Sequence, residues 1–177
     1  TSRAVAAACG RGGVRETELV ERAGGVGACD GRGGHRVDRR DERAVVVNNA
    51  GVVSPGGMRD RVDAGELAAN LSVNLVAPLV LMRRFLQATA TLAKRRRVIN
   101  ISSGAGRRAI FGWGAYCAAK AGLDMATRVA ALEAQAARTG VELVSLAPGV
   151  IDTAMQGVIR SSSPEEFVDV ERFRQMK

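Results

Sequence analysis

Three short apolar runs, separated by long helix-forming segments, constrain the fold of this chain more than any other feature. The runs cover residues 44–47, 97–101 and 141–147, and each is followed by a polar or glycine-containing turn motif. Short apolar runs between turn signals are typical of buried parallel strands. Because strands that alternate with helices favour a parallel sheet covered by those helices, the sequence predicts an α/β fold.

The segments between the runs have the spacing and composition of helices. Residues 66–93 show helical periodicity, with Pro78 predicted as a kink or a break. Residues 115–138 are rich in helix-forming residues and are followed by Gly140, a suitable C-cap. The motif SSSPEE at residues 161–166 predicts the cap and first turn of another helix within residues 161–177.

Residues 1–43 differ from the rest in composition. They are crowded with glycine and arginine and contain no Ile, Phe, Tyr or Trp, so we expect no buried strand before Ala44. We interpret residues 1–43 as an atypical segment whose composition permits disorder, and residues 44–177 as the folded domain. Residues 27–33 fit the spacing GxxxGxG, which we interpret as a chance match in a glycine-rich segment.

Composition narrows the functional class. With 46% hydrophobic and 25% charged residues and no basic-then-apolar leader pattern, we expect a cytoplasmic globular protein. No uninterrupted apolar run is long enough to predict a membrane span. Cys9, Cys29 and Cys117 are too few to staple a small fold, and with His35 they match no familiar zinc spacing, so no metal site is expected. The net charge of +8 leaves a basic nucleic-acid-binding protein as a weak alternative, but only 3% of residues are aromatic, so we expect no nucleic-acid partner.

The chemistry centres on the single tyrosine, Tyr116, and on Lys120 one helical turn later. Residues four apart share a helix face, so the two side chains are expected to be neighbours. A free phenol titrates roughly three units too high for proton transfer at neutral pH, and a fixed ammonium lowers its pKa. The pair therefore predicts an acid/base, although this spacing alone is weak evidence.

Other polar motifs fall where strands end. Ser103 follows the second apolar run, NNAG at residues 48–51 follows the first, PGVIDT at residues 148–153 follows the third, and Asn74 lies in the helical segment between. Open parallel sheets bind ligands at the carboxyl ends of their strands. We expect these motifs to meet in one cleft.

In this order, the motifs over residues 44–153 resemble the short-chain dehydrogenase/reductase family. The resemblance implies a Rossmann-like sheet and hydride transfer between NAD(P)(H) and a carbonyl or alcohol. By the same resemblance, Tyr116 is the general acid, Lys120 lowers its pKa and holds the nicotinamide ribose, Ser103 orients the carbonyl, and Asn74 positions a water in a proton relay. Residues 44–177 are then a partial domain of this family.

The resemblance also implies a cofactor site and partners. Two turns would line the cofactor, together with Tyr116 and Lys120: Asn49, Ala50 and Gly51 in the first, and Pro148, Gly149, Ile151 and Thr153 in the second. The tail is similar to sepiapterin-reductase-like and benzil-reductase-like members, which reduce ketones or diketones with NADPH, and residues 155–167 would form a lid. We therefore expect NADP, with NAD not excluded, a small-molecule carbonyl substrate, no membrane partner, and a homodimer formed through residues 66–93 and 115–138.

The sequence departs from the family pattern at both ends. We find no opening strand followed by the family's glycine-rich TGxxxGxG turn, and no strand after the tail helix. The expected sheet is thus truncated or incomplete on its N-terminal side, with residues 44–47 at an exposed edge. Two hypotheses stay open: an active NAD(P)H-dependent ketone or diketone reductase, or a catalytically silent Rossmann-like fragment that cannot hold cofactor.

Overall fold

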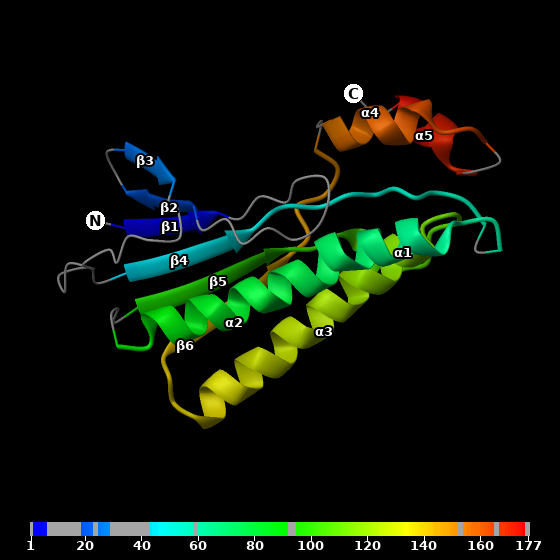
Figure 1. Cartoon of the computed structure of the whole chain (residues 1–177). Coiled ribbons are helices and arrows are strands. Elements are labelled where there is room, and N and C mark those ends of the chain that lie inside the picture. The colour runs from blue at the N-terminus through cyan, green and yellow to red at the C-terminus, as the bar shows by residue number, and fades with distance from the viewer. Residues whose placement is uncertain are drawn as a thin grey trace.

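A six-stranded sheet forms the centre of the molecule (Figure 1). The computed structural model describes residues 2–6, 19–22, 25–28, 43–58, 60–91, 95–151, 154–164 and 167–175. The strand order is β3-β2-β1-β4-β5-β6. The strands are β1 (Ser2–Ala6), β2 (Leu19–Arg22), β3 (Gly25–Ala28), β4 (Arg43–Asn48), β5 (Arg95–Ile101) and β6 (Val141–Leu146).

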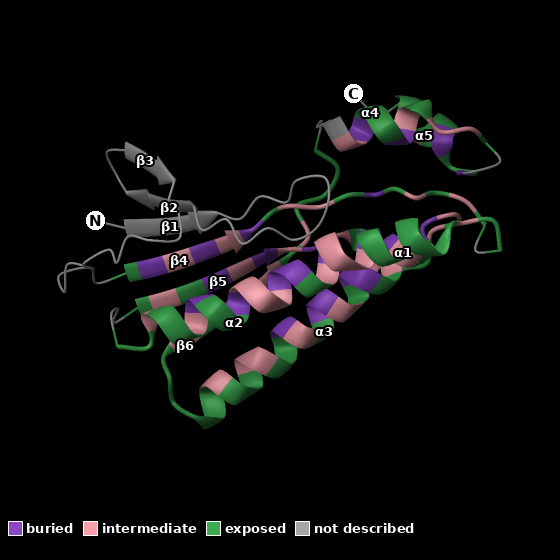
Figure 2. Ribbon diagram, in the orientation of Figure 1, coloured by how far each residue is buried: buried purple, intermediate pink, exposed green. Residues whose placement is uncertain are grey.

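The three predicted strands are confirmed as β4, β5 and β6, which pair in parallel. Val46 faces Val98 across the first pair, and Val98 faces Leu143 across the second. Alternate residues of β4 are buried, whereas Val144 and Leu146 of β6 are exposed. The parallel α/β sheet with flanking helices is therefore confirmed, with one face more completely covered than the other (Figure 2).

The sheet continues on the other side of β4, where the sequence predicted an edge. Strand β1 pairs in parallel with β4, with Ser2 opposite Arg43 and Ala6 opposite Val47, and β2 and β3 extend the sheet in antiparallel pairs. The expectation that residues 44–47 lie at an exposed edge is therefore wrong, because strand β1 pairs along that edge. A strand ladder is made by backbone groups, which any residue except proline supplies in full, so an apolar run is not required. The division of the chain at residue 43 stays a prediction.

One long helix, rather than a helix broken at Pro78, follows β4. It comprises α1 (Ala64–Leu71), a π-helical turn η1 (Ser72–Val76) and α2 (Ala77–Thr89). The Asp63 side chain caps it by accepting hydrogen bonds from the backbone N–H groups of Gly65 and Glu66, at 2.9 and 3.1 Å. Pro78 lies in the first turn of α2, so a widened turn precedes the proline and no break occurs.

The helix Ala64–Thr89 is also long and apolar enough to cross a membrane by length and composition alone, which the sequence analysis did not anticipate. Core helices of soluble proteins pass the same test. Here α2 packs against β4, β5 and α3, and 28% of the most apolar window is buried. Much of the surface of this helix is therefore exposed.

Helix α3 (Gly114–Ala136) confirms the second predicted helix and carries Tyr116 and Lys120. It packs against β6 and against η2 (Gly104–Gly106), a short 3-10 turn after β5. The chain leaves the helix through Arg138 and Gly140, which have φ values of 49° and 68°. The predicted C-cap at Gly140 is wrong: the helix is capped at Ala137, and Gly140, whose left-handed conformation glycine adopts without strain, lies three residues beyond the cap.

Two apolar cores hold these layers together. The first lies between the sheet and α2 and includes Val46, Phe85 and Val98. The second lies beyond the carboxyl ends of the strands, around Trp113 and Tyr116. Helices α4 (Ala154–Ser161) and α5 (Val170–Gln175) belong to this second core (Figure 1).

The predicted helix start at SSSPEE is wrong. Helix α4 ends at Ser161, where that motif begins, and α5 starts only at Val170. The buried Ile159, Phe167 and Val170 pack together, so apolar contacts of the tail set its helices rather than the capping signal.

Candidate active site

Tyr116 lies in the first turn of α3 with its side chain in the second apolar core. It is 6% exposed, and its ring meets Trp113 edge-on with ring centroids 5.7 Å apart. Burial raises the pKa of Tyr116 above its ordinary value, and a hydrogen bond with the Ser103 side chain partly opposes this rise. The structure therefore brings Ser103 and Tyr116 together and keeps the phenol protonated at neutral pH.

Lys120 lies one turn further along α3 and is also buried, at 4% exposure. Its Nζ donates a hydrogen bond of 2.8 Å to the carbonyl oxygen of Ile101, at the end of β5. The same Nζ lies 5.6 Å from the centroid of the Tyr116 ring. Burial lowers the pKa of Lys120 to about 8, while the negative charge of Asp124 raises it. At neutral pH the ammonium form of Lys120 is therefore still the major form, but its pKa lies only about one unit above the pH.

These directions bear on one expectation from the sequence. Lys120 was expected to lower the pKa of Tyr116; the net effect of the surroundings is to raise it, and the separate effect of Lys120 stays a prediction. Burial is the larger influence, because removing water penalises the charged form of each group: phenolate for the tyrosine, ammonium for the lysine.

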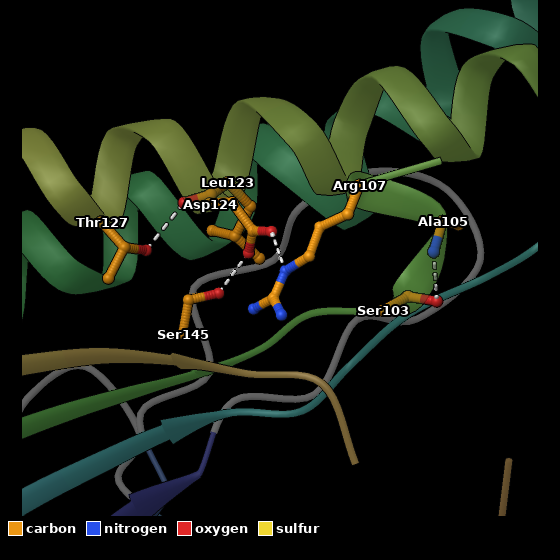
Figure 3. Close-up of polar contacts among 7 residues, drawn as sticks. All are labelled: Ser103, Ala105, Arg107, Leu123, Asp124, Thr127 and Ser145. Carbon is orange, nitrogen blue, oxygen red and sulfur yellow. Dashed lines mark hydrogen bonds and ion pairs between the residues drawn. The ribbon is translucent and has the colours of Figure 1, made fainter. Parts of the chain in front are cut away.

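Ser103 starts the η2 turn and is fixed by it. Its Oγ accepts a hydrogen bond of 3.2 Å from the backbone N–H of Ala105 (Figure 3). The turn lies directly on α3, since a Cβ added at Gly106 would come within 2.9 Å of the Lys120 carbonyl carbon. Glycine at this position therefore permits the close approach of Ser103 to Tyr116.

Asn74 lies in the π-helical turn and is fully buried. Its amide clamps the backbone of Val52, donating to the carbonyl oxygen at 2.7 Å and accepting from the N–H at 3.1 Å. A Cβ added at Gly51 would lie 3.1 Å from Asn74 Oδ1 and 3.6 Å from Lys120 Nζ. Asn74, Gly51 and Lys120 thus share one small space.

Asn70 also belongs to this arrangement, and the sequence analysis missed it. It is 1% exposed, accepts a hydrogen bond of 3.0 Å from Asn74 Nδ2, and donates to the carbonyl oxygens of Val52 at 3.2 Å and Ser54 at 2.8 Å. One sequence signal could have identified it: Asn70 and Asn74 lie four residues apart in an otherwise apolar helix, so their side chains share one face.

The predicted cofactor residues after β4 and β6 lie at the carboxyl ends of the two parallel strands that flank β5. Asn49 is exposed beside Ala50 and Gly51, and the turn after β6 is exposed at Pro148, Gly149 and Ile151. Gly149 has a φ of 85°, a conformation that favours glycine. Thr153 lies outside the described residues, as do Cys9, Cys29 and His35.

These residues fit the nicotinamide and ribose end of a dinucleotide. The side-chain-free Gly51 and the amine of Lys120 lie beside exposed backbone that can approach a ligand closely. Most of the GxxxGxG match at residues 27–33 falls outside the described residues, so the prediction that it is a chance match stays a prediction.

The tail supplies an aromatic wall beside Tyr116. Trp113 stacks on Phe167 with ring centroids 4.8 Å apart and an interplanar angle of 20°, and Phe173 lies 5.8 Å from the same Trp113 ring. Met155 of α4 reaches to 3.9 Å from a Cβ built at Gly51. Segments within the predicted lid, residues 155–167, therefore do lie over the site.

Comparisons with known proteins agree with this arrangement. The family described as short chain dehydrogenase matches residues 37–164. A benzil reductase, (S)-benzoin forming, from Bacillus cereus is 42% identical over 75% of this chain and 53% of the relative, and a sepiapterin reductase from Bos taurus is 35% identical over 69% and 45%. A crystal structure from Beutenbergia cavernae, assigned as an NAD(P)-dependent gluconate 5-dehydrogenase with NADP at low occupancy, is 33% identical with a TM-score of 0.62, covering 71% of this chain and 47% of that one.

The chain therefore spans about half the length of the curated relatives it matches. The match nevertheless covers most of the chain, and it includes the carboxyl ends of β4, β5 and β6 and the helices from α1 to α4. The chain belongs to the short-chain dehydrogenase family of oxidoreductases.

Proposed function

We propose that this chain carries the catalytic centre of an NADP(H)-dependent reductase that converts a ketone or diketone into an alcohol. The observation that carries the proposal is the convergence of Ser103, Tyr116 and Lys120 beside an open backbone turn at Gly51. The 42% identity to a benzil reductase favours a ketone or diketone substrate.

In this proposal Tyr116 donates the proton to the carbonyl oxygen. Burial keeps this phenol protonated at neutral pH, so it holds the proton that reduction requires, and the Lys120 charge must lower its pKa for the transfer to occur. The Ser103 hydroxyl holds the carbonyl oxygen within reach of the phenol and stabilises the negative charge that develops on that oxygen. The Ser103 hydrogen bond then also stabilises the phenolate that remains.

Lys120 and Asn74 support this proton transfer. The Lys120 ammonium lies 5.6 Å from the Tyr116 ring, where its positive charge favours loss of the phenolic proton during reaction. Asn74 fixes the Val52 backbone beside Gly51, and we propose that it also positions a water in a proton relay. Both residues therefore act on the chemistry by holding charge or water in place.

The cofactor would be held by the backbone of Asn49, Ala50 and Gly51, by Lys120, and by the turn at residues 148–153. NADP(H), when bound, supplies the hydride. We propose NADP because the tail resembles NADPH-dependent members. One structural neighbour carries NADP at low occupancy and another, a 4-hydroxyisoleucine dehydrogenase, is complexed with NADH, so NAD stays the alternative.

The second candidate is a protein that keeps these residues but binds no cofactor. It is favoured by the burial of Tyr116 under the aromatic tail, which must open before any substrate reaches the phenol. NADPH titration followed by Trp113 fluorescence separates the two, with Lys120→Ala as control. Saturable quenching at micromolar NADPH, weakened in Lys120→Ala, supports the reductase. No response up to millimolar NADPH in a folded chain overturns it.

We further propose that two copies associate through the long helices. Val76 before α2 and Met125, Val129 and Leu132 of α3 are exposed apolar side chains, and these helices lie side by side. We expect Leu132→Asp to shift a dimer to monomer in light scattering, and an unchanged mass would contradict this interface. A cytoplasmic location, and the absence of nucleic-acid and membrane partners, stay predictions.

A further inference from the structure

Asp124 is a buried carboxylate that the chemistry above does not use. It lies in α3 one turn after Lys120 and is 4% exposed. One carboxylate oxygen, Oδ1, accepts a hydrogen bond from the Ser145 hydroxyl of β6. The other, Oδ2, has no hydrogen-bond partner among the described residues and lies 3.8 Å from Nε of Arg107 (Figure 3). A carboxylate buried in this way costs free energy unless nearby positive charge offsets the burial.

Each neighbour of Asp124 belongs to a segment of the proposed site. Arg107 follows the η2 turn that Ser103 begins, and its backbone N–H closes that turn on Gly104 with a bond of 3.1 Å. Ser145 lies in β6, just before the exposed residues 148–151. Lys120 lies one turn earlier in the same helix as Asp124, so this carboxylate lies next to three segments of the proposed site.

We propose that Asp124 is a positioning residue of the reductase site, which supplies the negative charge opposite Lys120 and holds the Ser103 turn and β6 against α3. The inference rests on the proposed function. It assigns no contact with substrate, since Asp124 acts through Lys120 and Arg107.

The charges around Lys120 explain why such a residue is needed. Tyr116 on the same helix is neutral, Asn74 from η1 and the Ile101 carbonyl from β5 carry no charge, and Arg107 near Asp124 is positive. Burial lowers the pKa of Lys120, and Asp124 is the acidic group that opposes this effect. Without Asp124, the pKa of Lys120 would be lower still.

The test compares four variants: Asp124→Asn, Asp124→Glu, Ser145→Ala and Arg107→Ala. The first readout is the titration midpoint of the Lys120 amine, followed by NMR of nitrogen-labelled lysine in the cofactor-free protein. The second is the pH profile of diketone reduction with NADPH. Near-ultraviolet circular dichroism checks that each variant is folded.

We expect Asp124→Asn to move the Lys120 midpoint below that of the wild type, and to lower turnover several-fold at about pH 8.5 but about twofold or less at about pH 6.5. Asp124→Glu restores both, and Ser145→Ala, which keeps the charge, leaves the midpoint in place. Arg107→Ala removes an exposed positive charge and moves the midpoint upward; because Arg107 is 59% exposed, this variant is expected to fold even if Asp124→Asn does not.

An unchanged Lys120 midpoint in both Asp124→Asn and Arg107→Ala overturns the proposal. So does a loss of turnover that is equal at both pH values, which indicates a purely structural role. Absence of turnover in the wild type overturns the proposed function instead, while the NMR midpoint still decides the role of Asp124.

Discussion

Replacement of Lys120 by methionine is expected to stabilise the protein while it abolishes its proposed activity. The side chain is 4% exposed, and its ammonium is satisfied by one hydrogen bond, to the Ile101 carbonyl at 2.8 Å. Methionine has a similar length and no charge, so it fills the same space without the cost of burying an ion. Such a conflict between stability and function is common at catalytic positions.

The size of the effect follows from the pKa. A change from 10.5 in the unfolded chain to about 8 in the folded protein corresponds to about 3 kcal/mol of destabilisation below pH 8. Loss of the hydrogen bond to Ile101 offsets about 1–2 kcal/mol of the gain. We therefore expect Lys120→Met to be more stable than the wild type by about 1–2 kcal/mol at pH 7.

The pH dependence gives the sharper prediction. Between about pH 8 and 10.5 the unfolded state holds more protons on Lys120 than the folded state, so wild-type stability rises with pH across this window. Lys120→Met lacks that rise, and its advantage shrinks as the pH increases. The raised pKa of Tyr116 acts only above pH 10 and in the opposite direction, because the unfolded chain then loses its phenolic proton first.

Urea unfolding followed by circular dichroism at about pH 7 and about pH 9.5 measures both quantities. Arg128→Met is the matched control, because it removes an exposed cation from the same helix. We expect the control to keep the wild-type pH dependence. If Lys120→Met also kept it, or if the variant were less stable than the wild type at pH 7, the inference that Lys120 is penalised by burial would be refuted.

Three further substitutions probe the rest of the site. Gly106→Ala should lower the free energy of unfolding by about 2 kcal/mol or more, because the added Cβ would lie 2.9 Å from the backbone of α3. Gly56→Ala should be near neutral, because nothing lies within 4 Å of an added Cβ there, and urea unfolding of both variants measures the difference. Asn74→Leu should cost about 3 kcal/mol by leaving buried polar groups unpaired, and a loss below about 1 kcal/mol in the same assay would contradict the clamp. Tyr116→Phe should lower ketone turnover by about a thousandfold or more while NADPH affinity changes by about twofold or less, as kinetics and fluorescence titration would show.

Much of the site is predictable from the sequence because parallel sheets gather their strand ends. The turns after β4, β5 and β6 are distant in sequence, yet the shared strand direction places all three at one edge of the sheet. Tyr116 and Lys120 follow from helix spacing alone. The structure brings both together with Ser103, Asn74 and Gly51 as predicted, although their chemical roles stay proposals.

The parts that were missed depend on contacts that no local pattern encodes. Strand β1 has no long apolar run, and its place in the sheet comes from backbone pairing with β4. Helix α4 precedes the capping motif that was expected to start the tail helix, because packing of Ile159 and Phe167 sets its position. The role of Asn70 becomes visible only in the structure, where its side chain donates hydrogen bonds to the backbone carbonyl oxygens of Val52 and Ser54.

The direction of the Tyr116 pKa illustrates the same limit and bears on function. Sequence spacing places an ammonium near a phenol, and the sign of that one interaction is a lowered pKa. Burial depends on the whole fold, and here it raises the pKa of the tyrosine and lowers that of the lysine. Both shifts reduce the net charge of the resting site, because the phenol is protonated at neutral pH and the lysine lies near its titration point. The proposed proton transfer from Tyr116 therefore requires a nearby positive charge, such as the Lys120 ammonium, to lower the tyrosine pKa again during the reaction.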